Sequence, residues 1–133
     1  MTHIKMHAFS SSLHVDIELW NKEMCHFNNA LLIFDTGASV TTISEDIILG
    51  LGYNVSEGKI QKITTGSGVA YVREVIIDSI KLGNHIVNDV RVYAHTFPDE
   101  SFTTGVIGLN VISMFDVNLL FSKKIIELRP IEP

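Results

Sequence analysis

One aspartate in this chain stands at the end of an apolar run and is followed directly by a threonine and a glycine. The run is Leu-Leu-Ile-Phe at residues 31–34, and it leads into Asp35, Thr36 and Gly37. A carboxylate beside apolar side chains loses water, which disfavours its charged form. The hydroxyl of Thr36 can form hydrogen bonds, and Gly37 lets another backbone come close. These residue types at this spacing make Asp35 a candidate for acid–base chemistry.

Hydrolysis of a peptide bond without a metal or a covalent intermediate needs one group that activates water and another that supplies a proton. Two neighbouring carboxylates can do both, because like charges held close together share one proton. None of the other aspartates is followed by Thr-Gly or Ser-Gly: Asp16, Asp46, Asp78, Asp89, Asp99 and Asp116. A second Asp35, from another copy of the chain related by a two-fold axis, would complete such a pair.

The length and composition are those of a single globular domain. The chain has 133 residues, of which 46% are hydrophobic and 19% charged, and its net charge is −5 with histidine neutral. Because basic residues are few and scattered, we expect no nucleic-acid partner. No apolar stretch approaches the roughly 20 residues of a membrane span, and the first ten residues lack the apolar segment of a signal peptide. We therefore expect a cytoplasmic protein with no membrane partner.

Short apolar segments of period two predict strands along most of the chain. Leu13, Val15, Ile17 and Leu19 alternate with polar residues or tryptophan, which is typical of a half-buried strand. Further strands are expected at 30–34, 40–43, 60–65, 69–77, 76–82, 86–93, 117–121 and 125–128, short helices at 44–49 and 109–115, and a loop at 94–105. Many short strands with little helix predict an all-β fold, either a barrel or a compact sandwich.

Three segments occur in a fixed order along the chain. They are Asp35-Thr36-Gly37 with its apolar flank, a Gly66-Ser67-Gly68 hairpin turn, and Val106-Ile107-Gly108. In this combination the chain resembles the retropepsin-like (retroviral-type) aspartic proteases, in particular their single-domain cellular and bacterial relatives. The resemblance implies a compact closed β-barrel with a flap hairpin and one or two short helices. It spans residues 13–129, which leaves 1–12 as an N-terminal extension and 130–133 as a C-terminal tail.

The resemblance also implies an aspartic endopeptidase that is an obligate homodimer with one shared active site, takes an extended peptide or protein substrate, and needs no cofactor or metal. Asp35 would be the catalytic carboxylate, Thr36 would hydrogen-bond across the dimer, and Gly37 would admit the substrate backbone. The implied substrate-binding residues are Ala38 and Ser39 on the floor and Thr65, Gly66, Ser67 and Gly68 in the flap. Val106, Ile107 and Gly108 would pack under the active-site loop.

Two positions depart from the retroviral pattern. Retroviral enzymes commonly carry an acidic residue where this chain has Ser39 and an arginine where it has Leu109. These two residues form an ion pair near the dimer interface in that family, and here both are replaced together. We therefore expect other contacts, such as the terminal strands, to hold the dimer.

Other interpretations of the same residues stay open at this point. Asp-Thr-Gly and Gly-Ser-Gly also occur as ordinary turns. His3 and His7, or the neighbours Cys25 and His26, do not by themselves provide the ligands of a closed zinc site. Cys25 is the only cysteine, which excludes an internal disulfide, and we expect a packed or partly buried thiol. A catalytically weak peptide- or protein-binding dimer of the same fold is the alternative to an active enzyme, and an unrelated ligand-binding β-barrel is a third possibility.

Overall fold

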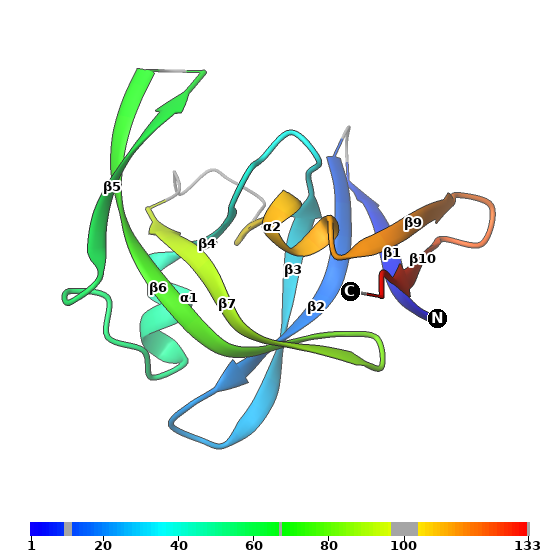
Figure 1. Cartoon of the computed structure of the whole chain (residues 1–133), viewed down its shortest axis with the longest axis horizontal. Coiled ribbons are helices and arrows are strands. Elements are labelled where there is room, and N and C mark those ends of the chain that lie inside the picture. The colour runs from blue at the N-terminus through cyan, green and yellow to red at the C-terminus, as the bar shows by residue number, and fades with distance from the viewer. Residues whose placement is uncertain (10–11, 67, 97–103, 133) are drawn as a thin grey trace.

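The structure is a computed structural model that describes residues 1–9, 12–66, 68–96 and 104–132. Within these ranges the chain is all-β with two short helices (Figure 1). The strands are β1 Thr2–Phe9, β2 Ser12–Asn21, β3 His26–Phe34, β4 Thr41–Ser44, β5 Lys59–Thr65, β6 Gly68–Leu82, β7 His85–His95, β8 Gly105–Ile107, β9 Phe115–Leu120 and β10 Ile125–Pro130. The helices are α1 Glu45–Gly50 and α2 Leu109–Ile112. The all-β prediction is confirmed, and both predicted helices are present.

Six strands form a continuous circuit of hydrogen-bonded pairs. The circuit runs β6–β7–β4–β8–β3–β2 and returns to β6, where Glu18 pairs with Lys81 and Leu19 with Ile80. The pairs β3–β8 and β4–β7 are parallel, and the others are antiparallel. The short strand β8 therefore lies between β3 and β4 and joins segments that are distant in sequence. Closure of this circuit into a true barrel stays a prediction.

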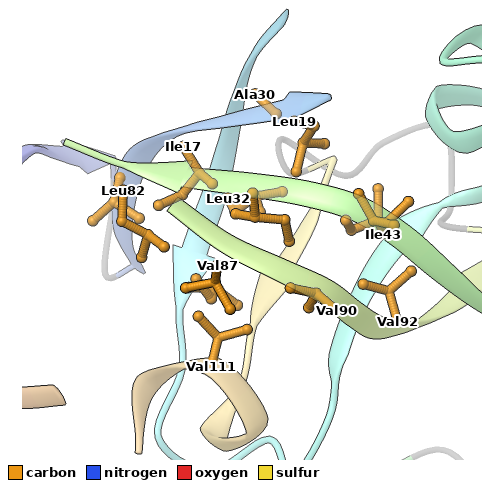
Figure 2. Close-up of a cluster of buried hydrophobic side chains, with 14 of the residues drawn as sticks. Ile17, Leu19, Ala30, Leu32, Ile43, Leu82, Val87, Val90, Val92 and Val111 are labelled. Atoms are coloured by element: carbon orange, nitrogen blue, oxygen red, sulfur yellow. The ribbon is translucent and has the colours of Figure 1, made fainter. Parts of the chain in front are cut away.

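The strands of the circuit turn their apolar side chains into one core (Figure 2). Along β2, Val15, Ile17 and Leu19 are at most 1% exposed, while the residues between them are half-buried. Side chains from β3, β4, β7 and α2, among them Leu32 and Val111, converge on the same interior. The period-two pattern thus predicted correctly which face of β2 is buried.

The N-terminal strand β1 was not anticipated from the sequence. Residues 2–5 pair with β10, and residues 6–9 pair with β2. Ile4 and Met6 are buried, whereas Lys5 is exposed. The sequence signal for this strand is weak, because only these two apolar residues alternate with polar ones between positions 2 and 7. The segment assigned to an N-terminal extension therefore contains a strand that pairs with two others.

The hairpin turns were predicted well, although several element ends were not. β5–β6, β6–β7 and β9–β10 are antiparallel hairpins, and the long strand β6 belongs to two of them. β3 begins at His26, four residues before the predicted strand at 30–34. The predicted helix at 109–115 ends at Ile112, and Phe115 begins β9. Of the predicted loop 94–105, residues 97–103 lie outside the described ranges.

In the described residues no helix has both the length and the apolar character needed to cross a membrane.

Candidate active site

Asp35 follows β3 at the point where this strand pairs with β8. Ile33 and Phe34 lie opposite Val106 and Ile107 in parallel register, and the Asp35 N–H donates to the Ile107 carbonyl at 3.0 Å. The apolar run before Asp35 is therefore explained by the core, because Leu32 is fully buried and Phe34 is 8% exposed. Asp35 itself is half-buried, so the carboxylate is less enclosed than its apolar flank predicted.

A local hydrogen bond orients the Asp35 carboxylate. The Gly37 N–H donates to Asp35 Oδ1 at 2.8 Å, and the Ala38 N–H donates to the Asp35 carbonyl at 3.3 Å. A Cβ atom at position 37 would lie 3.1 Å from Oδ1, which is tighter than most such contacts. Glycine at this position therefore allows the turn to close on the carboxylate. Thr36, Gly37 and Ser39 are exposed on the outer side of this loop.

The segment 106–110 lies directly against the Asp35 loop. The Leu109 N–H donates to the Ala38 carbonyl at 2.8 Å, and the Asn110 N–H donates to the Ser39 carbonyl at 3.1 Å. A Cβ at Gly108 would come within 2.8–2.9 Å of the backbone of Ala38 and Val40, so only glycine fits there without a backbone shift. The structure thus brings Val106, Ile107 and Gly108 together with the Asp35 loop.

Asn110 and the buried Thr41 form a polar junction next to this loop that no sequence pattern indicates. Asn110 Oδ1 accepts from both the N–H and the hydroxyl of Thr41 at 2.8 Å, and Asn110 Nδ2 donates to the Arg91 carbonyl at 2.7 Å. The Thr41 hydroxyl also accepts from the Gly108 N–H at 3.0 Å, and Thr41 is fully buried. One amide side chain on α2 therefore joins β4, β7 and the Asp35 loop.

A cavity of about 360 Å³ lies beside the Asp35 loop and reaches the β5–β6 hairpin. Its lining residues are Gly37, Ala38, Ser39, Val40, Thr42, Ile63, Thr64 and Tyr93. Ala38 and Ser39 were predicted to line the substrate site, and the structure places both at this cavity. Gly66 and Gly68 are not among the described lining residues, whereas the side chain of Thr65 and the whole of Ser67 lie outside what the structure describes. Thr65 pairs with Gly68 at the end of the hairpin ladder.

The Asp35 loop and the segment 106–110 that packs against it both lie in a stretch that matches a known protein family. A family model described as "Aspartyl protease" matches residues 28–111, which is more than half of the chain.

The chain belongs to the aspartyl protease family.

The structure of this aspartyl protease also resembles a solved one. The crystal structure of a retropepsin-like aspartic protease from Rickettsia conorii matches with a TM-score of 0.68 at 14% sequence identity, covering 94% of this chain and 87% of that one. No curated protein sequence gives a significant match. The predicted membership of a retropepsin-like family is confirmed, and the low identity limits the structural likeness to the fold.

Among the described residues of this aspartyl protease, no second carboxylate forms a hydrogen bond with the Asp35 carboxylate. In the described ranges its side chain forms one hydrogen bond, with the Gly37 N–H, and no ion pair. The Gly37 N–H thus fixes the position of Oδ1.

The other candidate residues of this aspartyl protease do not form a second site. Among the described residues, no group of three or more His, Cys, Asp or Glu side chains is placed to hold a metal ion. His7 lies 2.7 Å from Asp16 across β1 and β2. Cys25 is exposed in the turn between β2 and β3, so the prediction of a packed or partly buried thiol was wrong. A tight turn with φ of 56° at this position carries the side chain outward.

Proposed function

We propose that this protein is an aspartic endopeptidase in which two Asp35 carboxylates, one from each subunit of a homodimer, activate water to hydrolyse a peptide bond. The observation that carries the proposal is the oriented Asp35 carboxylate at the edge of a cavity, with one oxygen held by the Gly37 N–H at 2.8 Å. Membership of the aspartyl protease family supports it. A peptide-binding dimer without catalysis is the outcome that would replace it.

The proposed chemistry needs one proton shared by the pair. The ionised carboxylate takes a proton from water as the water oxygen bonds to the substrate carbonyl carbon, and the protonated carboxyl gives its proton to the carbonyl oxygen. Collapse of the tetrahedral intermediate breaks the C–N bond as a proton passes to the leaving amine. Thr36 would brace the pair across the two-fold axis.

The β5–β6 hairpin is proposed to act as a flap over an extended substrate. It projects from the rest of the molecule in Figure 1, and its inner residues Ile63 and Thr64 line the same cavity as the Asp35 loop. A peptide lying between them could form main-chain hydrogen bonds as an added strand does, while closure of the hairpin excludes water from the carboxylates. None of the described residues that line the cavity is charged, which favours uncharged substrate segments.

The second copy is proposed to dock on the free edge of β9. The sheet order ends at β9, whose paired side faces β10. Val117 and Leu119 on this strand are 36% and 40% exposed. Leu109, directly after Gly108, is 39% exposed. An exposed edge with apolar side chains favours pairing with another strand. This surface therefore connects the edge strand to the region where a second Asp35 is needed.

A two-fold axis near Asn118 gives the most favourable register for antiparallel pairing of two β9 strands. Val117 would then lie opposite Leu119 of the partner subunit, so that apolar residues pair across the axis. Asp116 would lie opposite the partner's Leu120, which separates the two Asp116 carboxylates. The expected cytoplasmic location and the closed barrel remain predictions that accompany this proposal.

The catalytic proposal is tested with the full chain and a diverse peptide library from acid to neutral pH. Asp35→Asn is expected to reduce cleavage by about 1,000-fold or more, because general acid–base catalysis is lost, while fold and dimer persist. Asp89→Asn is the matched control, because Asp89 is exposed on β7 and far from the loop in sequence. Equal cleavage by wild type and Asp35→Asn would rule out the mechanism. Binding of peptides without cleavage at any pH would support the non-catalytic alternative.

The interface is tested by sedimentation of single charged variants. Val117→Lys and Leu119→Lys are each expected to give monomers without activity, whereas Met24→Lys, an exposed apolar residue in the β2–β3 turn, is expected to stay dimeric. The double variant Val117→Glu/Leu119→Lys should regain the dimer, because the two introduced charges are opposite in sign and face each other across the axis. Active dimers of both single variants would rule out this interface.

A further inference from the structure

Among the described residues, Tyr93 is the aromatic side chain that lines the cavity beside the Asp35 loop. It is half-buried on β7, where it lies opposite Thr42 of β4 on one side and Glu74 of β6 on the other. The other walls come from small or aliphatic residues, so the ring provides the largest flat surface in the cavity. A substrate side chain that enters here would therefore pack against the Tyr93 ring.

A chain of polar contacts holds this ring from behind. The Arg91 guanidinium carbon lies 5.8 Å from the centroid of the Tyr93 ring, within the range of a cation–π contact. Arg91 Nε is 3.9 Å from Glu74 Oε1, and Gln61 Nε2 donates to Glu74 Oε2 at 3.0 Å. The Glu74 side chain is only 19% exposed, so its charge depends on these two partners.

This chain of contacts connects the cavity wall to the base of the flap hairpin. Gln61 lies on β5 and Glu74 on β6, the two strands of the hairpin, whereas Arg91 and Tyr93 lie on β7. The backbone carbonyl of Arg91 in turn accepts a hydrogen bond from Asn110, which supports the Asp35 loop. A change in the Glu74–Arg91 pair is therefore expected to move the cavity wall while leaving the loop's own hydrogen bonds in place.

We propose that Tyr93 determines which substrate side chain the cavity accepts, and that the Glu74–Arg91 pair positions its ring. The inference rests on the proposed peptidase function and adds its side-chain specificity. The cavity takes an uncharged side chain, because its described lining residues are all uncharged and burial of an unpaired charge is costly. The Tyr93 ring limits the size of that side chain, so aliphatic residues fit better than the largest aromatic ones.

The test compares kcat and KM for peptides that differ at one position near the cleaved bond, with Leu, Trp, Asp or Lys at that position. Wild type should prefer Leu. Tyr93→Ala should raise the Trp-to-Leu ratio of kcat/KM by about 10-fold through KM, because removal of the ring enlarges the cavity. Tyr93→Leu should shift the ratio in the same direction by less and serves if the alanine variant unfolds. Ile86→Ala is the matched control, because Ile86 lies on the same strand, is 47% exposed and is outside the proposed flap and the cavity lining.

Glu74→Gln tests the positioning pair. This variant keeps an acceptor for Gln61 but removes the charge that faces Arg91, so it should shift the same ratio by about 3-fold, since a partly exposed ion pair is weak. A purely structural pair would lower stability and leave the Trp-to-Leu ratio at its wild-type value. That result would limit the proposal to Tyr93 and overturn the role of the pair.

Failure of this inference can be told apart from failure of the proposed function. If the wild type cleaves peptides but Tyr93→Ala and Ile86→Ala give the same ratio, the specificity role of Tyr93 is wrong and the peptidase stands. If no peptide is cleaved, the same peptide series is measured by calorimetry with the wild type and both variants. A Trp-to-Leu ratio of Kd values that shifts only in Tyr93→Ala would still support the cavity assignment, and an unchanged ratio would overturn it.

Discussion

The loop after β3 and the tip of the β5–β6 hairpin border the same cavity, but they are held in different ways. Loop residues 35–39 bond to residues 107–110, more than 65 positions further along the chain. Hairpin residues 61–65 and 68–72 pair with one another, and in the described structure their ladder has no third strand. Under the proposed function, the carboxylate that meets its counterpart needs a fixed place, whereas the hairpin that covers a substrate must open. The two kinds of support match these two needs.

The glycines of the two regions show the same contrast. Gly108 lies so close to the backbone of Ala38 and Val40 that a Cβ has no room. At Gly66, near the hairpin tip, an added Cβ would meet nothing within 4 Å. Glycine in the loop region therefore serves close packing, while glycine at the tip leaves open space around the turn.

The largest effect is expected from Gly108→Ala. The added methyl group forces the Asp35 loop away from its support, which should destabilise the protein by about 1–3 kcal/mol. It should also lower kcat/KM by about 100-fold, because small displacements of catalytic groups are costly. Urea unfolding and peptide cleavage measure the two effects. Gly66→Ala should change the free energy of unfolding by less than about 0.5 kcal/mol. Equal destabilisation by the two variants would contradict the contrast between loop and hairpin.

A smaller effect is expected from Asn110→Ala, which removes the amide behind the loop. The Thr41 N–H and the Arg91 carbonyl would lose their partner, and an unsatisfied buried polar group costs about 1–3 kcal/mol. Activity should fall by about 10-fold as the loop loosens. The exposed Asn88, which accepts from the Ser79 hydroxyl, gives a matched control in Asn88→Ala, for which we expect a change below about 0.5 kcal/mol. A stability change in Asn110→Ala as small as in the control would show that the junction does not hold the loop.

The loop and the hairpins were predictable because their signals are local. Asp35-Thr36-Gly37 after an apolar run, and the glycine turns at 66–68 and 83–84, act over a few residues of chain. The same holds for α1, where acidic residues open the helix at Glu45 and Asp46. Each of these features depends on neighbours in sequence, so a single sequence is enough to find it.

The missed features depend on contacts across long stretches of chain. Asn110 and Thr41 are 69 positions apart, and nothing in their neighbours indicates that one supports the other. Tyr93 and Ile63 line one cavity only because the registers of β6 with β5 and with β7 bring them together. Strand β1 carried too few apolar residues to be recognised, and its pairing with β10 joins the two ends of the sequence. All three features therefore depend on contacts between segments that are far apart in the sequence.

The smallest effect is expected from a change at the base of the β5–β6 hairpin. Unlike the tip, this base is held by contacts with the rest of the chain. Tyr53, in the segment between α1 and β5, is 5% exposed. Its hydroxyl donates to the Trp20 carbonyl at 2.9 Å and accepts from the Asp78 N–H at 3.2 Å. Burial raises the pKa of the Tyr53 hydroxyl above its ordinary value of 10.0, and the nearby Asp78 charge adds to this rise, although the Asp78 N–H opposes it. The folded state therefore favours the protonated phenol.

Tyr53→Phe should cost about 1 kcal/mol below pH 10 through the lost hydrogen bonds. Because the pKa of this hydroxyl is higher in the folded chain than in the unfolded one, the unfolded chain loses its proton first as pH rises above about 10. The free energy of unfolding of the wild type should then fall more steeply with pH than that of the variant, by at most about 1.4 kcal/mol per pH unit. Other groups titrate equally in both proteins, so urea unfolding from pH 8 to 11 isolates the difference. If the free energies of unfolding of wild type and variant fell equally with pH, burial would not raise the pKa of the Tyr53 hydroxyl. The proposed contacts at the base of the hairpin would then be wrong.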